Sequence, residues 1–167
     1  LECVHVDVSN VVAGGFALHM GIGGAKEIIG VDRSEASLEL AKKAAEKNNL
    51  SEKCTWLKDN AFDVLERMNK EKEKFDIVVC DPPAFAKVKK DIAAGLRGYR
   101  KMSRLAAGLV EKGGILALGS CSHHVSPEEF MRECCRGISE AGQNGRILLQ
   151  AGSGADHPVH PHLPETA

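Results

Sequence analysis

Short apolar runs alternate with longer segments of helical period along most of the chain. Six runs are apolar on both faces, which is typical of buried parallel strands: residues 3–8, 27–31, 54–57, 75–80, 115–119 and 146–149. Five segments between them have the spacing of helices: residues 15–20, 35–48, 61–71, 92–110 and 127–141. This alternation predicts an α/β fold with a doubly wound, mostly parallel sheet.

Small and polar residues mark where these elements begin and end. Ser34 precedes the second predicted helix and Ser126 precedes the last one. Serine at these positions caps the free amides of a helix N-terminus. Glycines at 113–114 and within 142–145 predict ends and turns. The boundaries therefore agree with the hydrophobic pattern.

The chain is long enough for one hydrophobic core and too short for two domains of full size. We assign residues 1–150 to one domain, and residues 151–167, rich in Pro, His and Gly, to a C-terminal loop of that domain. With 43% hydrophobic and 27% charged residues, the composition excludes a disordered chain. No run approaches the ~20 apolar residues of a membrane helix. We expect no membrane partner.

The cysteines do not have the spacing of a structural zinc site. All six lie outside any Cys-x-x-Cys pair: Cys3, Cys54, Cys80, Cys121, Cys134 and Cys135. This pattern favours reduced thiols and a cytoplasmic protein. Three histidines between 157 and 162 resemble metal ligands, but the prolines among them favour an exposed loop. We predict no metal.

Three strand ends carry residues suited to a nucleoside cofactor, which binds beyond the carboxyl ends of the strands in such sheets. Gly14 and Gly15 let the backbone approach a ligand at a helix start. Asp32 is placed to accept hydrogen bonds from ribose hydroxyls, and the Asp-Asn pair at 59–60 to bind an adenine edge beside Phe62. The alternatives are an ordinary tight turn at Gly14 and Gly15, a surface aspartate at Asp32, and an ordinary helix cap at residues 59–60. A nicotinamide dinucleotide is disfavoured, because the full Gly-x-Gly-x-x-Gly motif is missing.

Two further strand ends carry candidate chemistry. Asp81 leads into Pro82 and Pro83. Each proline fixes its own φ and restricts the residue before it, so the carboxylate and nearby carbonyls form a rigid wall suited to a planar base. Cys121 follows the next strand and precedes a helix, which makes it a candidate nucleophile. The alternatives are a simple loop stop at the prolines and inert packing at the cysteine.

Positive charge is concentrated in one segment. The whole chain has a net charge of -1, which gives no overall reason to bind nucleic acid. Residues 87–104 hold seven basic residues and one acidic residue, a net charge of +6, which leaves -7 for the rest. Because this segment follows Asp81, we expect it to flank the site and contact a polyanion. The alternative is a solvated helix face. The candidate contacts are Lys89, Lys90, Arg97 and Arg100.

Several motifs together resemble a known family. The segments GGFALH from residue 14, IGVD from 29, NAF from 60, DPPAFAK from 81, SCSHH from 120 and DHP from 156 occur here in order. They resemble those of the class I S-adenosylmethionine-dependent methyltransferases that form 5-methylcytosine in large-subunit ribosomal RNA. The resemblance covers nearly the whole chain. It departs from the family pattern before Gly14, where six residues rather than five follow Asp7 and Ala13 replaces a threonine.

The resemblance implies S-adenosylmethionine as the cofactor and a role for each motif. The methionine part of the cofactor is assigned to Gly14, Gly15 and Phe16, its ribose to Asp32, and its adenine to Asn60, Ala61 and Phe62. Asp81 is assigned to both the cofactor and the target base. Pro82, Pro83 and Phe85 are assigned to the base. Cys121 is implied as the nucleophile.

The resemblance also implies a seven-stranded sheet with one antiparallel strand, which would follow Ala167. It further implies an RNA-binding PUA domain and a middle domain, neither of which is present here. The function it predicts is methylation of carbon 5 of a cytosine in ribosomal RNA through a cysteine adduct. Two alternatives stay open: methylation of an amino nitrogen of guanine or adenine without a covalent step, and a non-catalytic fragment that binds cofactor and RNA.

Overall fold

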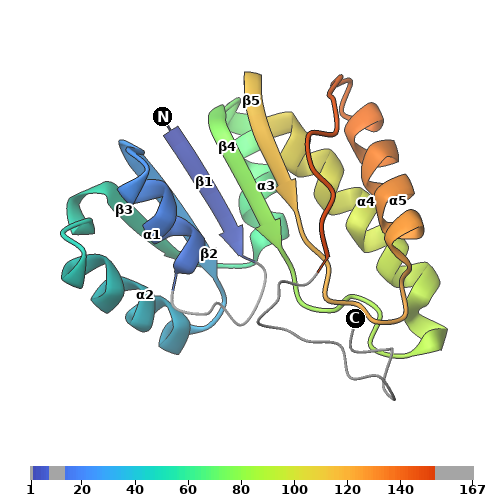
Figure 1. Ribbon diagram of the computed structural model, residues 1–167, viewed down its shortest axis with the longest axis horizontal. Coiled ribbons are helices and arrows are strands. Elements are labelled where there is room, and N and C mark those ends of the chain that lie inside the picture. Colours follow the sequence, from blue (N-terminus) through green and yellow to red (C-terminus); the bar gives the residue numbers. More distant parts are fainter. Residues whose placement is uncertain (1, 8–13, 153–167) are drawn as a thin grey trace.

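The computed structural model describes residues 2–7 and 14–152, with side chains from residue 14 onward. Strands and helices alternate along the described residues as far as Glu140 (Figure 1). The strands are β1 (Glu2–Asp7), β2 (Glu27–Asp32), β3 (Cys54–Lys58), β4 (Phe75–Asp81) and β5 (Val110–Leu118). The helices are α1 (Gly15–Ile22), α2 (Glu35–Lys47), α3 (Ala61–Glu71), α4 (Ile92–Leu109) and α5 (Pro127–Glu140), with short 3₁₀ turns η1 (Ser51–Lys53) and η2 (Lys89–Asp91).

The five described strands form one parallel sheet in the order β3-β2-β1-β4-β5. The chain fills one side of β1 first and then returns to fill the other. At the carboxyl edge, Asp32 is in register with Lys58, and Asp7 with Asp81. The direction of winding reverses between β1 and β4, which is where doubly wound sheets bind their ligands. The predicted fold class is confirmed.

The side chains of β2 alternate between two hydrophobic layers. Ile28 packs with Ala17 of α1 on one face, whereas Val31 packs with α3 and α4 residues on the other. Gly30 lies under the Trp56 ring, where an added Cβ would collide with the indole. The larger core lies on the α3–α4 face, where Tyr99, Leu65 and Met102 are among the largest fully buried side chains. The sheet edge that carries the candidate residues therefore rests on packed layers.

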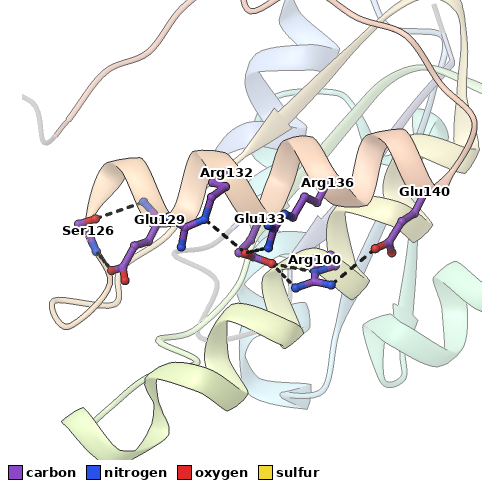
Figure 2. Close-up of polar contacts among 7 residues, drawn as sticks. All are labelled: Arg100, Ser126, Glu129, Arg132, Glu133, Arg136 and Glu140. Atoms are coloured by element: carbon purple, nitrogen blue, oxygen red, sulfur yellow. Dashed lines mark hydrogen bonds and ion pairs between the residues drawn. The ribbon is translucent and has the colours of Figure 1, made fainter.

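The predicted helix starts are confirmed in detail. Ser34 Oγ accepts a hydrogen bond from the Ser37 amide at 3.3 Å. At the start of α5, Ser126 Oγ accepts from the Glu129 amide at 3.2 Å, while the Ser126 amide donates to Glu129 Oε2 at 3.1 Å (Figure 2). This reciprocal capping box satisfies two amides that the helix itself leaves free.

Two predictions about elements are wrong. Residues 146–149 form no strand, and Figure 1 draws them as irregular coil after α5. An apolar run forms a strand only when a neighbour pairs with its backbone, and in the described part of the chain β5 pairs with β4 alone. The glycines at 113–114 do not separate a helix from a strand but lie inside β5, where Gly113 has φ +85° and the register with β4 shifts.

No helix among the described residues is long and apolar enough to cross a membrane. The cysteines whose side chains are described are all free thiols: Cys54, Cys80, Cys121, Cys134 and Cys135. Three sequence predictions fall outside the described residues: the altered segment before Gly14, the tail histidines, and most of the loop predicted for 151–167.

Candidate active site

The structure brings the candidate residues to one edge of the sheet. Asp32 is the last residue of β2 and Asp81 the last of β4, while Asn60 and Cys121 follow β3 and β5 within three residues. Because all five strands are parallel, their carboxyl ends share that edge. Neighbouring strands are about 4.8 Å apart, so Asp32 and Asp81, separated only by β1, lie within reach of one ligand the size of a nucleoside.

The glycine turn begins α1 at this edge. Gly14 is the N-cap residue with φ +74°, a left-handed conformation that glycine adopts without strain. A Cβ on Gly14 would lie 3.1 Å from Ala41 Cβ and from the Trp56 ring. A Cβ on Gly15 would meet nothing within 4 Å of the described atoms. Phe16, the next residue, is half exposed. The backbone at Gly15 is therefore open to a ligand.

Asp32 is a buried carboxylate with one oxygen unused. The side chain is 2% exposed, and Oδ1 accepts a hydrogen bond from the Ser34 amide at 2.6 Å. Oδ2 is buried and has no hydrogen-bond partner among the described residues. A buried acceptor without a donor is costly, so its presence points to a partner supplied by a ligand. A ribose diol supplies such donors, and the residues present here fit that part of the cofactor.

The third predicted cofactor segment begins α3. Asn60 Oδ1 accepts from the Phe62 amide at 2.9 Å and so acts as the helix cap. The Ala61 side chain is buried in the core, which leaves its backbone to face a ligand. The Phe62 ring stacks on Phe85 at 6.1 Å between centroids, with Lys101 Nζ 5.1 Å from the Phe62 centroid. The helix-cap interpretation of Asn60 is correct. Its backbone amide donates to Asp59 Oδ1 at 2.7 Å, whereas its side-chain nitrogen Nδ2 has no hydrogen bond among the described residues.

Asp81 ends β4, and Cys121 follows the adjacent strand β5 by three residues. The Cys121 thiol is exposed and donates to the Pro82 carbonyl at 3.5 Å. Asp81 is half-buried, and this burial raises the pKa of its carboxyl above the ordinary value. A Cβ on Gly119 would lie 2.7 Å from Asp81 Oδ1, so glycine leaves room there for the carboxylate. The structure thus places the Cys121 thiol against the carbonyl of the residue that directly follows Asp81.

The predicted base-contacting residues differ in exposure. Pro82 is buried and Pro83 half-buried. The Phe85 ring packs between Phe62 and Tyr99, with its centroid 4.7 Å from that of Tyr99. Much of the Phe85 side chain is therefore used in packing, which fixes the loop that Asp81 begins.

The basic segment divides into two parts. Lys89 and Lys90 lie in η2, and Arg97 lies on the first half of α4; all three are exposed. Arg100 instead donates from Nε to Glu133 Oε2 at 2.7 Å and lies 3.7 Å from Glu140 (Figure 2). Its guanidinium therefore holds α4 against α5. Lys89, Lys90 and Arg97 are thus exposed, whereas the Arg100 guanidinium is engaged with α5.

Sequence reasoning missed two features. Glu133 is 3% exposed and is surrounded by guanidinium groups from Arg100, Arg132 and Arg136 (Figure 2). The i, i+3 spacing of Glu133 and Arg136 on one helix was the available signal. The second feature is Tyr99, the single tyrosine of the chain, which is fully buried. It lies against residues 119–126, the segment between β5 and α5 that we call the Cys121 loop. No motif marked it.

Metal-ligating residues do not gather anywhere in residues 2–7 or 14–152: no group of three or more His, Cys, Asp or Glu could hold an ion there. The site offers instead an open glycine turn, a buried acceptor and a thiol beside a carboxyl group. These are the parts of a group-transfer site that uses an organic cofactor.

This fold and this arrangement of strand ends define a class I methyltransferase domain. A family model described as a methyltransferase domain matches residues 13–152, and the chain belongs to that family.

Comparisons with individual proteins agree. Ribosomal RNA large subunit methyltransferase I of Tolumonas auensis is 39% identical over 153 residues, which is 91% of this chain and 38% of that protein. A Streptococcus mutans protein assigned as a SAM-dependent methyltransferase superposes with a TM-score of 0.80 at 20% identity, covering 99% of this chain and 42% of that one. An O-methyltransferase from Bacillus cereus in complex with SAH gives 0.58 at 16% identity, covering 83% and 60%. The chain thus spans less than two-fifths of the length of the curated relative.

Proposed function

We propose that this chain transfers a methyl group from S-adenosylmethionine to carbon 5 of a cytosine in large-subunit ribosomal RNA, with Cys121 as the nucleophile. The observation that carries the proposal is the 3.5 Å contact of the Cys121 thiol with the Pro82 carbonyl, next to Asp81. A thiol held against a base-binding turn has no use in methylation of an amino nitrogen. The name of the Tolumonas relative supports ribosomal RNA as the substrate.

The cofactor is assigned to the strand ends on the β2 side. Asp32 Oδ2 would accept hydrogen bonds from the ribose hydroxyls, and the open backbone at Gly15 would face the methionine part. The side-chain nitrogen of Asn60 would face adenine. When bound, the cofactor supplies an electrophilic methyl group on sulfur. The family of the chain and the SAH-bound Bacillus cereus neighbour support this assignment.

The chemistry at the base requires a nucleophile because carbon 5 of cytosine is itself unreactive. The Cys121 thiolate adds to carbon 6 and forms an S–C bond, and the electrons of the 5,6 double bond make carbon 5 nucleophilic. After carbon 5 gains its methyl group, a base removes the proton from that carbon, the double bond re-forms, and the thiolate leaves. Each adduct thus returns the free thiol.

Asp81 is assigned to the ring nitrogen and amino edge of the base. Its raised pKa favours a shared proton at the ring nitrogen, which stabilises the added base. Pro82 and Pro83 hold the turn rigid, so the carboxyl group does not have to be ordered when the base arrives. A free thiol is needed throughout, and this favours the cytoplasm as the location.

Covalent trapping tests the proposal. RNA from the large subunit that contains 5-fluorocytosine is incubated with the chain and S-adenosylmethionine, and adducts are separated on a denaturing gel. Fluorine at carbon 5 cannot leave as the proton does, so the adduct is expected to persist. Cys121→Ser should form none, whereas Cys135→Ser, which removes an exposed thiol on α5, should form as much as the wild type.

The other outcomes distinguish the alternatives. Methyl transfer to an exocyclic amino group without an adduct would favour the amino-nitrogen mechanism. Binding of S-adenosylhomocysteine and RNA with neither adduct nor methyl transfer would favour a binding-only domain. Full methyl transfer to cytosine carbon 5 by Cys121→Ser would contradict the covalent mechanism.

A further inference from the structure

One fully buried hydroxyl lies between the two serines that flank Cys121. Tyr99 of α4 is 0% exposed, and its hydroxyl is 2.7 Å from Ser122 Oγ. Ser120 Oγ donates to the same hydroxyl at 2.8 Å. Because Ser120 donates to the tyrosine oxygen, the tyrosine hydrogen is free to be donated to Ser122. A single side chain thus holds the residues on both sides of the candidate nucleophile.

The same network reaches the loop that carries Asp81. Ser122 Oγ accepts from the Ala86 amide at 3.2 Å, and this bond is buried. The Ser122 amide in turn donates to Ser120 Oγ at 3.3 Å. The Cys121 loop is therefore joined to the Asp-Pro-Pro loop at two places: through Ser122 to Ala86, and through the Cys121 thiol to the Pro82 carbonyl.

The Tyr99 ring is fixed independently of its hydroxyl. It packs against Phe85 at 4.7 Å between centroids and against Phe130 of α5 at 5.0 Å, edge to face. Ser103 Oγ also bonds to the Tyr99 carbonyl at 2.8 Å. A ring held on two sides presents its hydroxyl at a fixed point, and buried networks of satisfied groups specify one arrangement.

We propose that Tyr99 is the positioning residue that sets the Cys121 thiol against the Asp81–Pro82 turn, acting through Ser120 and Ser122. This inference rests on the proposed role of Cys121 as the nucleophile. Tyr99→Phe keeps the ring packing but removes the shared partner of two serine hydroxyls. The Cys121 loop is then free to leave the Pro82 carbonyl, so the thiol becomes easier to reach from solvent and is less often at the distance that attack on a base requires.

Thiol alkylation tests this directly, because the chain carries its own controls. Wild type and Tyr99→Phe are treated with iodoacetamide under native conditions, and labelling of each cysteine is followed by peptide mass spectrometry. Cys121 is expected to react at least threefold faster in the variant. Cys135, exposed on α5 and outside the network, should react at the same rate in both proteins, and buried Cys80 and Cys134 should stay protected in both.

Turnover gives the second measurement. In Tyr99→Phe the kcat for methyl transfer should fall at least tenfold, with an unchanged KM for S-adenosylmethionine, because the network does not touch Asp32 or the glycine turn. Ser122→Ala, which removes the link between the loops without touching the ring, should change Cys121 labelling and kcat in the same directions.

The possible failures are distinguishable. An unchanged Cys121 labelling rate overturns the role of Tyr99, and it leaves the proposed function intact if the wild type still forms the 5-fluorocytosine adduct. Faster labelling of Cys80 and Cys134 along with Cys121 also overturns it, because the tyrosine would then only stabilise the core. If only Cys121 is labelled faster in Tyr99→Phe, but the wild type forms no 5-fluorocytosine adduct, the positioning role of Tyr99 is supported. The role of Cys121 as the nucleophile is then contradicted.

Discussion

The two carboxylates at the ends of β2 and β4 have different surroundings. Asp32 is almost fully buried, receives one backbone hydrogen bond and keeps one oxygen unpaired in the described structure. Asp81 is half-buried and has a raised pKa. The first is suited to accepting hydrogen bonds from neutral hydroxyls, and the second to sharing a proton with a base. Their environments therefore agree with different roles on the same sheet edge.

Asp32→Ala should weaken S-adenosylhomocysteine binding by about 1.5–3 kcal/mol, the usual cost of losing hydrogen bonds to a charged group. Isothermal titration calorimetry measures this loss directly. Thermal unfolding without ligand controls for the loss of the Ser34 contact. Unchanged affinity in a folded variant would contradict the assignment of the ribose to Asp32.

The two glycines of the α1 turn provide a matched pair. Gly14→Ala should destabilise the fold by about 1–3 kcal/mol, because alanine in the left-handed region is strained and its Cβ would press on Ala41 and Trp56. Gly15→Ala, in open space at a helix start, should leave stability equal or slightly higher. If the cofactor approaches this backbone, Gly15→Ala should nevertheless weaken S-adenosylhomocysteine binding. Unfolding and calorimetry on both variants separate the two effects, and full affinity in Gly15→Ala would place the cofactor elsewhere.

Asp81→Asn should stabilise the fold at neutral pH while it removes activity. A carboxyl whose folded pKa is raised above its ordinary 3.8 contributes stability that is complete below that value and lost as pH rises through the folded pKa. At pH 7 the wild type therefore holds a partly desolvated charge that the amide avoids. The free energy of unfolding, measured in urea, should be higher for the variant at pH 7, and the difference should vanish near pH 3. An equal difference at both pH values would show that the charge is not its cause.

At the scale of the elements, one buried carboxylate and one small residue contribute to the packing of α4 against α5. Glu133 accepts two close contacts from Arg100, and its other oxygen lies 2.9 Å from Arg136 Nη1 (Figure 2). Gly137 lets the helices approach closely, because a Cβ there would collide with the Arg100 carbonyl. The docking of α5 matters for function because its capped N-terminus follows the Cys121 loop directly.

Glu133→Ala should cost about 2 kcal/mol of stability, the value of charge-assisted hydrogen bonds whose partners keep access to water. Glu140→Ala removes an exposed partner 3.7 Å from Arg100 and should cost about 0.5 kcal/mol or less. Burial acts to raise the pKa of Glu133, but the hydrogen bonds and charges of its arginines outweigh it and the pKa is lowered. The stability it gives is therefore present above its ordinary 4.5 and lost as pH falls. Urea unfolding at pH 7 and pH 3 tests both statements, and equal losses for the two variants would contradict them.

The sequence predicted most elements because their signals are local. Apolar runs, helical spacing and serine caps located the five α-helices and five strands of the described residues to within a few residues, with the start of β5 the largest difference. The short 3₁₀ turns η1 and η2 were not predicted. The sixth run failed because its apolar character does not supply a pairing partner. The predictions for the tail histidines and for the segment before Gly14 stay untested, because both lie outside the described residues.

At the scale of the whole molecule, the parallel sheet is what converts scattered motifs into a site. Residues 32, 60, 81 and 121 are far apart in the chain, and only the strand order brings them to one edge. The alternation of strands and helices predicted a parallel sheet whose carboxyl ends share one edge, but the full strand order was not part of that prediction. Contacts between helices, such as Arg100 with Glu133 and Tyr99 with the serines, could not be predicted, because they depend on how α4 lies against α5 and the loops.

The last prediction concerns RNA binding by the charged surface of this molecule. Lys89, Lys90 and Arg97 are exposed near the start of α4, whereas Arg100 is engaged with α5 and is left unchanged. Each phosphate contact adds about 0.7 to the slope of log affinity against log salt for a single strand. Reversing the three residues to Glu should therefore weaken binding to a short single-stranded RNA and lower that slope by about 2.

The matched control reverses Lys26, Lys43 and Lys47, which are exposed on the part of the molecule built by β2 and α2. The change in net charge is identical, so a purely global electrostatic effect would weaken RNA binding equally in both variants. Fluorescence anisotropy over a series of salt concentrations gives both slopes. If residues 87–104 contact phosphates, only the variant with Lys89, Lys90 and Arg97 reversed should have a lower salt slope. Counterions are released only where the RNA is bound. Equal slopes in the two variants would mean that residues 87–104 form a solvated face, and the RNA would then have to reach Asp81 and Cys121 from another direction.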